Sequence, residues 1–239
     1  ITVERAMYFS AAGRFWAGGH ATAAVAAPAT EWFAAEGRTG PLFDMFLLLA
    51  NPSDQPNPAT IRFLLPGGGV VSQAPTLPPR SRTTVWVNQV PGLAETDVSA
   101  SVTAKRPVIV ERAMYWSGGP GRWQEAHASA ALTTTGTRWL LAEGEQGGSL
   151  GYDTFVLLAN PGDRDATVRV TRLRADGRPP AARDIDVPAH SRATLNGRAF
   201  GLDPGEQFGI LVDSTNGVPI VVERAMYWNG GGQFWGGGS

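Results

Sequence analysis

The sequence predicts an all-β protein made of two tandem immunoglobulin-like β-sandwich domains. The first observation is a motif, Val-Glu-Arg-Ala-Met-Tyr plus an aromatic residue, that occurs at 3–9, 110–116 and 222–228. Its copies are separated by 110 − 3 = 107 and 222 − 110 = 112 residues, which is the size of a domain. Between the copies, short strand-like stretches alternate with turn signals, as in sandwiches and barrels. The chain also has 30 glycines and 18 prolines, which supply the turns.

Composition excludes several classes of function. The net charge is −1 and no run of lysine or arginine occurs, so we expect no nucleic-acid partner. The chain has no cysteine, which excludes disulfides and thiolate metal sites. No apolar run approaches the roughly 20 residues that span a bilayer, so no membrane insertion is expected.

Each motif copy predicts a strand at the start of a hairpin. In the first copy, Val3, Arg5, Met7 and Phe9 fall on one face of the strand. Each copy is followed by glycines and then by a tryptophan, which indicates a turn and a returning strand.

The segments between the motifs also match. Residues 30–37 match 137–144, and residues 43–52 match 152–161, where Asn-Pro ends a buried strand because proline cannot donate to the ladder. We therefore expect an N-terminal hairpin at 1–27 shared with unit one, a first β-sandwich repeat at 28–120, and a second at 121–239 with a truncated terminal hairpin.

The blocks Val-Glu-Arg-Ala-Met-Tyr-Trp, Ala-Glu-Gly and Leu-Leu-Ala-Asn-Pro resemble a tandem β-rich repeat domain of unknown function from large secreted bacterial proteins. The resemblance covers essentially the whole chain. It implies an extracellular or cell-surface location and supplies no activity or catalytic residue. Because the chain begins and ends within the same motif, we expect it to be a piece of a longer protein.

The repeated arginines predict structural ion pairs. Neighbouring side chains of a strand point to opposite faces, so each arginine shares a face with apolar residues and needs a partner there. The recurring carboxylates are the expected partners, and catalysis by a carboxylate pair is the weaker interpretation, since an enzyme seldom repeats its site. The predicted residues are Arg5, Arg112, Arg224, Glu36, Glu143, Asp44 and Asp153.

No enzyme motif or metal site is evident. His20 and His127 occupy the same repeat position in different units, and His190 has no ligand-spaced neighbour. The aspartate-rich loops lack the ligand density of calcium loops. We expect no catalytic, cofactor-binding or metal-ligating residues and no cofactor.

Two kinds of contact with partners are predicted. Trp16, Trp123 and Trp235 lie beyond glycine-containing turns, where they either stack on a sugar or a protein or cover the domain junction. The strand of Val3, Arg5, Met7 and Phe9 either folds back on unit one or adds to a sheet of a neighbouring copy. The second outcome would give a head-to-tail filament.

These observations favour a non-enzymatic structural repeat module of an extracellular or cell-surface bacterial protein, acting as a spacer, stalk or filament-forming unit. The alternative is an adhesion module that binds glycans or surface proteins through exposed tryptophans.

Overall fold

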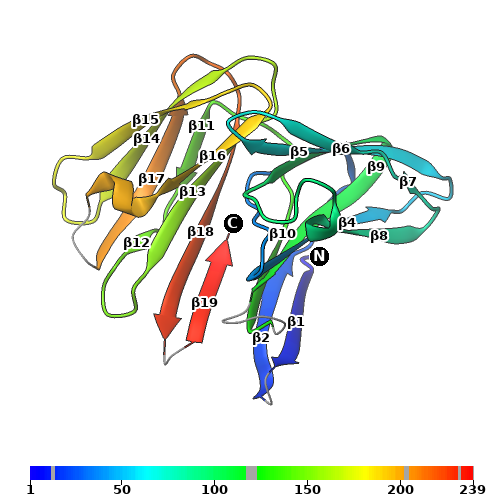
Figure 1. The fold of residues 1–239 in the computed structure, drawn as a ribbon, viewed down its shortest axis with the longest axis horizontal. Coiled ribbons are helices and arrows are strands. Elements are labelled where there is room, and N and C mark those ends of the chain that lie inside the picture. Colours follow the sequence, from blue (N-terminus) through cyan, green and yellow to red (C-terminus); the bar gives the residue numbers. More distant parts are fainter. Residues whose placement is uncertain (12–13, 117–122, 202–204, 231–232, 239) are drawn as a thin grey trace.

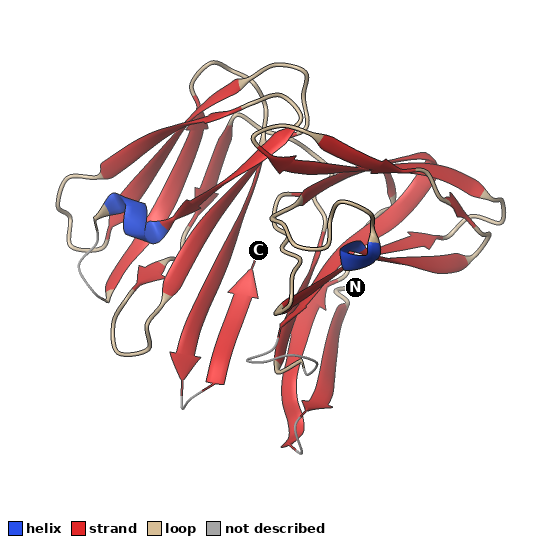
Figure 2. Cartoon of the chain, viewed as in Figure 1, coloured by secondary structure: helices blue, strands red, loops and turns tan. Residues whose placement is uncertain are grey.

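Strands make up most of the molecule (Figure 2). The computed structural model describes the chain except residues 12–13, 117–122, 202–204, 231–232 and 239. In the described residues the helical elements are two short 3₁₀ turns, η1 (Val87–Gln89) and η2 (Gly197–Phe200). The prediction of an all-β protein is confirmed. No helix of the described chain is long and apolar enough to cross a membrane.

The strands form an N-terminal hairpin and two bodies that lie next to each other (Figure 1). The hairpin consists of β1 (Glu4–Ala11) and β2 (Arg14–Ala23). The first body contains β3 (Ala29–Ala34), β4 (Phe43–Asn51), β5 (Asn57–Pro66), β6 (Val70–Gln73), β7 (Thr76–Leu77), β8 (Ser81–Trp86), β9 (Ser99–Trp116) and β10 (Glu125–Ala130). The second contains β11 (Arg138–Leu141), β12 (Glu145–Gln146), β13 (Asp153–Asn160), β14 (Ala166–Arg174), β15 (Ala181–Val187), β16 (Ser191–Asn196), β17 (Glu206–Ser214), β18 (Val221–Gly230) and β19 (Gln233–Gly238).

The long strand β9 joins the two layers of the first body. Its first part pairs with β3 and β5, and β5 pairs with β6. Its second part pairs with β4 and β10, and β4 pairs with β8. An 18-residue strand thus belongs to both sheets.

The second body repeats this arrangement with two strands in place of β9. Strand β17 pairs with β11 and β14, as the first part of β9 pairs with β3 and β5. Strand β18 pairs with β13 and β19, as the second part of β9 pairs with β4 and β10. The register is also the same, because Asp44 faces Tyr115 on the neighbouring strand and Asp153 faces Tyr227.

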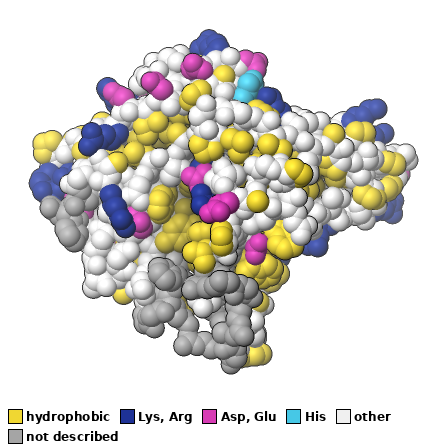
Figure 3. Space-filling model, viewed as in Figure 1, with side chains coloured by type: hydrophobic (Ala, Val, Ile, Leu, Met, Phe, Trp, Pro, Cys, Tyr) yellow, Lys and Arg dark blue, Asp and Glu magenta, His cyan; other side chains and the backbone are white. Residues whose placement is uncertain are grey.

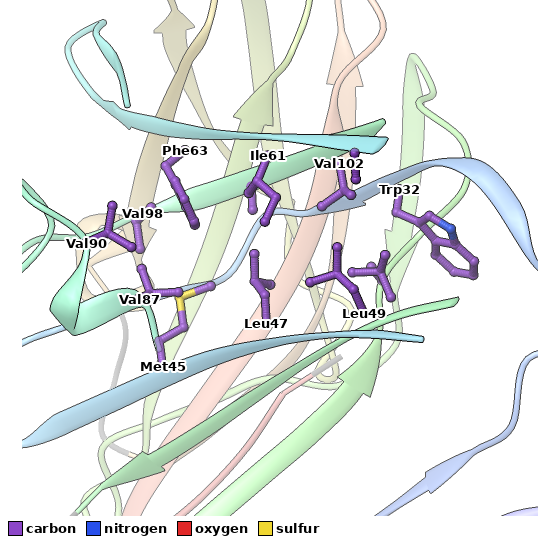
Figure 4. Packing of buried hydrophobic residues seen from close by; sticks show 14 of the residues in the cluster. Trp32, Met45, Leu47, Leu49, Ile61, Phe63, Val87, Val90, Val98 and Val102 are labelled. Atoms are coloured by element: carbon purple, nitrogen blue, oxygen red, sulfur yellow. The ribbon is translucent and has the colours of Figure 1, made fainter. Parts of the chain in front are cut away.

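Each body encloses its own apolar core. In the first, Met45, Leu47 and Leu49 of β4 face Ile61 and Phe63 of β5 across the space between the layers (Figure 4). Alternate residues point inward because the side chains of a strand alternate between its faces. The second core is built from β13, β14, β17 and β18, and a third cluster containing Phe33, Leu157 and Val221 lies between the bodies.

Two repeated positions, an asparagine and a tryptophan, explain why the same blocks occur in both bodies. The buried amide of Asn51 donates to the carbonyls of Gln55, Leu77 and Pro78, and Asn160 donates to those of Arg164, Val187 and Pro188. Asn-Pro therefore ends the strand and also ties its turn to the next one. In the same way, the indoles of Trp32 and Trp139 donate to the carbonyls of Val108 and Ile220.

The central hairpin consists of the second part of β9 and β10, and it crosses the expected boundary after residue 120. Glu125 pairs with Trp116 and Ala130 with Glu111, so β10 lies in a sheet of the first body. The hairpin β1–β2 forms a two-stranded sheet of its own and is not a first strand of unit one. The domain limits and the immunoglobulin-like topology remain predictions.

The tie made by Asn51 gives a first testable prediction. Replacing a buried group that satisfies three carbonyls leaves them without partners, so Asn51→Ala should lower the free energy of unfolding by about 2–4 kcal/mol. Urea denaturation measures this effect, and Asn160→Ala should behave alike. The exposed Thr60 on the neighbouring β5 provides the control, since Thr60→Ala should change stability by at most about 0.5 kcal/mol. Equal midpoints for Asn51→Ala and Thr60→Ala would contradict the prediction.

Candidate functional site

The most unusual group of side chains in the described structure surrounds Arg112, where the two bodies meet. Arg112 lies on β9 between Val110 and Met114, which belong to the core of the first body and share its face of the strand. Its side chain is 0% exposed. An arginine so deeply buried needs charged partners, because an unpaired buried charge costs several kcal/mol.

Arg112 is held by two carboxylates, one from each body. Its Nη1 lies 2.6 Å from Oε2 of Glu223, and its Nη2 lies 2.8 Å from Oε2 of Glu36. Nη2 also donates to Oγ of Ser129 at 2.8 Å and contacts the ring of His127 at 3.1 Å. Glu223 in turn accepts a hydrogen bond from the backbone N–H of Glu36 at 2.6 Å. We call Arg112, Glu36, Glu223, Ser129 and His127 the arginine cluster.

Glycines allow the surrounding backbone to approach this cluster closely. A side chain at Gly37, directly after Glu36, would collide with the carbonyl of Val98 and with Met45. A side chain at Gly238 on β19 would meet Glu36 and His127. Gly37 of the Ala-Glu-Gly block and Gly238 therefore allow close packing around the charges.

The ionisable groups of the arginine cluster shift one another's pKa values. Burial alone would lower the pKa of Arg112, but Glu223 and Glu36 raise it. Burial opposes ionisation of Glu36, yet Arg112 and His127 outweigh this effect and hold its pKa below the usual value. Burial dominates at Glu223 and raises its pKa, and it also raises the pKa of Tyr227 well above its ordinary value.

Such an arrangement is suited to joining the two bodies and poorly suited to catalysis. Glu36 and Glu223 are both buried, and each is already bound to the arginine. A hydrolase needs its two carboxylates on either side of a substrate bond, whereas here a guanidinium occupies the space between them. The nearby cavity has a volume of about 190 Å³ and is lined by Glu36, Phe43 and Tyr227 among others.

A second buried arginine reinforces the same junction. Arg192 of β16 lies 3.0 Å from the carboxylate of Asp97 and donates to Oγ of Ser99 at 3.2 Å. Beside them, β16 and β5 form two parallel residue pairs. Sequence reasoning did not single out Arg192 or Asp97, because Asp97 is not repeated: Gln207 stands at the matching place in the second unit.

The predicted ion-pair residues form two groups: the motif arginines with their glutamates, and the two aspartates, which have other partners. Arg224 pairs with Glu143 of its own unit at 3.1 Å, and Arg112 pairs with Glu36 of its own unit at 2.8 Å. Arg5 lies 2.7 Å from Glu111. The pairing of Arg112 with Glu223 of the following motif was missed. The signal was present in the motif, since each arginine follows a glutamate.

Asp44 and Asp153 require a correction, because both lie away from the motif arginines. Asp44 accepts hydrogen bonds from the indoles of Trp86 and Trp123 at 3.0 and 2.6 Å. Asp153 accepts from Asn196 at 2.7 Å and from Arg198 at 2.9 Å. Both face a tyrosine on the neighbouring strand and not the arginine, which pairs three residues further along β4 or β13.

The predicted aromatic residues differ in their surroundings. Trp123 is 40% exposed, and its ring centroid lies 4.4 Å from that of Tyr115. The partly buried Trp235 donates to the carbonyl of Gly230 at 3.2 Å. The side chain of Trp16 lies outside the described part.

The structure brings His20 and His127 near each other, because β2 packs against β10, and the pKa of His20 is lowered by burial, then by Arg5 and by His127. His127 belongs to the arginine cluster, His20 packs against Tyr115 with a centroid distance of 6.3 Å, and His190 contacts Asp163 at 2.8 Å. In the described residues no group of three or more histidine, aspartate or glutamate side chains could hold a metal ion.

The predicted edge strand is paired within its own chain. Arg5 and Met7 of β1 pair with Thr22 and His20 of β2, while Val3 accepts a hydrogen bond from the N–H of Ala24. Phe9 packs on Tyr115 at 5.8 Å. This hairpin therefore packs against β9 through its side chains.

The comparisons with known proteins give one family. A family model described as a family of unknown function (DUF5719) matches residues 17–198, about three quarters of the chain. A crystal structure of the Thermotoga maritima protein 1070 is similar over 45% of this chain and 96% of that one, with 14% identity and a TM-score of 0.41. No curated protein matches the chain.

The arginine cluster predicts a large effect of Arg112→Met. This variant leaves Glu36 and Glu223 buried without their cation, so the free energy of unfolding should fall by about 3–5 kcal/mol. Arg138, in an exposed pair with Asp213, is the matched control, and Arg138→Met should have a much smaller effect because solvent screens an exposed pair. Denaturant midpoints compare the two, and equal losses would show that the cluster is weak.

Glu125 predicts a pH effect of defined sign. Burial raises its pKa to about 7, from an ordinary value of 4.5. The folded state therefore binds more protons than the unfolded state between these values, and the contribution of Glu125 to stability falls as pH rises through this window. Glu125→Gln should be more stable than the wild type by about 2–3 kcal/mol at pH 8, with the difference shrinking toward pH 4.5. Thermal unfolding at both pH values tests this, and a constant difference would contradict it.

Proposed function

The chain belongs to the family of unknown function DUF5719, and we propose that it is a non-enzymatic structural module of an extracellular or cell-surface bacterial protein. In this role the two repeat units act as a rigid spacer or stalk, or as a unit of a filament. The repeated motif and its resemblance to tandem repeats of large secreted proteins support this proposal.

The arginine cluster is the single observation that carries the proposal. Its ionised groups come from both bodies: Glu36 and Arg112 from the first, and Glu223 from the second. Rotation of one body against the other would separate Arg112 from a carboxylate while leaving both buried, which is strongly unfavourable. A junction of this kind fixes the angle between units, and a spacer needs that property.

Rigidity at the junction can be measured directly. The chain has no cysteine, so Thr60→Cys and Thr167→Cys introduce one exposed spin-label site into each body. We expect a single narrow distance distribution by pulsed electron spin resonance, and a broader one when Arg112→Met is added. The exposed substitution Arg138→Met should leave the distribution unchanged. A broad distribution in the unmodified background would contradict the rigid-spacer role.

A second candidate function, binding of a glycan or a surface protein, is favoured by one aromatic cluster. Phe46, Tyr115 and Trp123 line a mostly apolar cavity of about 370 Å³, and Trp86 stacks on Phe46 with a centroid distance of 5.7 Å. Asp44 fixes both indoles through its hydrogen bonds. Flat aromatic faces held in this way are suited to stacking on sugar rings.

A glycan array separates the two candidates. The adhesion role requires a bound glycan whose signal is lost in Trp123→Ala and kept in Trp139→Phe, since Trp139 packs in the core of the second body. An array without signal, together with a narrow spin-label distribution, supports the structural role.

A further inference from the structure

The repeated hairpins are stacked in the order of the sequence. The C-terminal hairpin β18–β19 lies against the central hairpin, and the central hairpin lies against β1–β2 (Figure 1). Each arginine reaches the glutamate of the next motif copy: Arg5 contacts Glu111 at 2.7 Å, and Arg112 contacts Glu223 at 2.6 Å. Arg224, the arginine of the last copy, has no later copy in this sequence to contact.

The arginine in the middle of this stack is buried, and those at its two ends are more exposed. The side chain of Arg5 is 46% exposed, that of Arg112 is 0% exposed and that of Arg224 is 15% exposed. Arg224 already holds the partner from its own unit, Glu143, as Arg112 holds Glu36. Relative to Arg112, it lacks the contribution of a following unit.

The surface next to Arg224 is a cavity of about 490 Å³ in the second body. We call it the socket. Its lining includes Glu143, Gly144, Glu145, Tyr152, Gln207 and Met226. In the first body the matching residues are Glu36, Gly37, Arg38, Phe43, Asp97 and Met114.

The matching surface of the first body is covered. There the second body contributes Phe155, Leu157, Thr194, Ala225 and Tyr227, and the remaining space is about 190 Å³. The same surface is therefore closed in the first unit by the unit that follows it and open in the second.

The first unit carries the complementary face. Phe46, Leu48, Thr84, Ala113 and Tyr115 occupy the positions that match the covering residues of the second unit, and they line the cavity of about 370 Å³. We call this surface the plug face. Figure 3 shows charged and apolar side chains next to each other near the middle of one face of the molecule, and no broad patch of one charge on the part of that face that is described.

We propose that the socket of one chain binds the plug face of a second copy of this chain, head to tail, with Arg224 of the first pairing with Glu111 of the second. This inference rests on the proposed structural function and names its partner and its interface. Because the socket and the plug face are different surfaces of one molecule, the contact is heterologous and continues from copy to copy.

In the free chain the N-terminal hairpin occupies the plug face. Arg5, Met7 and His20 line the same cavity, and Arg5 holds Glu111. This hairpin is a two-stranded sheet of its own, a marginally stable element, whereas β18 is anchored along β13. The hairpin β18–β19 of a neighbouring copy therefore replaces β1–β2, which acts as a removable cover.

Charge reversal in the full-length chain tests this contact. Sedimentation velocity from about 1 μM to about 1 mM covers the range of weak protein contacts. We expect the wild type to form dimers and longer species as concentration rises. Arg224→Glu and Glu111→Arg should each weaken association at least roughly tenfold, because like charges then meet at the interface. An equimolar mixture of the two variants should associate again, since each altered charge finds its opposite.

Two further variants make the result unambiguous. Arg5→Glu loosens the cover from Glu111 and should strengthen association, whereas Arg138→Glu, in an exposed pair away from both surfaces, should leave it unchanged. If the wild type and Arg5→Glu both remain monomeric up to about 1 mM, a concentration at which even weak contacts form, the proposal is wrong. Equal association of wild type and Arg224→Glu would also overturn it. Either failure leaves the spin-label distances unaffected, so the rigid-spacer function is judged separately.

Discussion

The fold depends on neutralising one buried cation. Arg112 sits on the strand that closes the first body, and its charge is balanced by Glu36 of that body and by Glu223 of the next. Burial raises the pKa of Glu223, and the neighbouring Glu36 adds to this effect. At Glu36 burial acts in the same direction, but Arg112 and His127 outweigh it and lower the pKa. The neighbouring His127 and Ser129 complete the shell. Geometry this specific favours one orientation of the units over many others.

The same motif meets different surroundings in its three copies. In the centre of the stack it is enclosed on both sides, and at the ends it has a neighbour on one side. The motif keeps its Glu-Arg pair in all three copies, although the burial of the arginine differs. Arg112 contacts a glutamate of its own unit and a glutamate of the next motif copy, whereas the ion pairs of Arg5 and Arg224 described above involve one glutamate each. One cavity lies next to Arg224, which contacts no glutamate of a following copy, and the other is lined by Glu111, the glutamate of the central copy.

The strand content and the matching blocks could be predicted because alternation and turn residues are local properties. The burial of Arg112 and its contact with Glu36 could also be predicted, since an arginine on an apolar face needs a carboxylate. The role of Asp44 could not, because its partners Trp86 and Trp123 are brought to it by the register of β4 against β8 and by the place of Trp123 just before β10. The motif supplies Glu223, but its contact with Arg112 could not be predicted, because the contact spans 111 residues and depends on how two finished bodies pack.

That long separation has a consequence for synthesis on the ribosome. The first body is complete in sequence once β10 has emerged, yet Arg112 must wait for a glutamate that is made 111 residues later. Domains generally fold in order from the N-terminus at about 5–20 residues per second, so a finished first body holds Arg112 against Glu36, still without the contact to Glu223, for several seconds. During that interval the surface that later meets the second body is open to water. During this interval that surface can bind another nascent copy, and synthesis of the second unit ends the exposure by covering it.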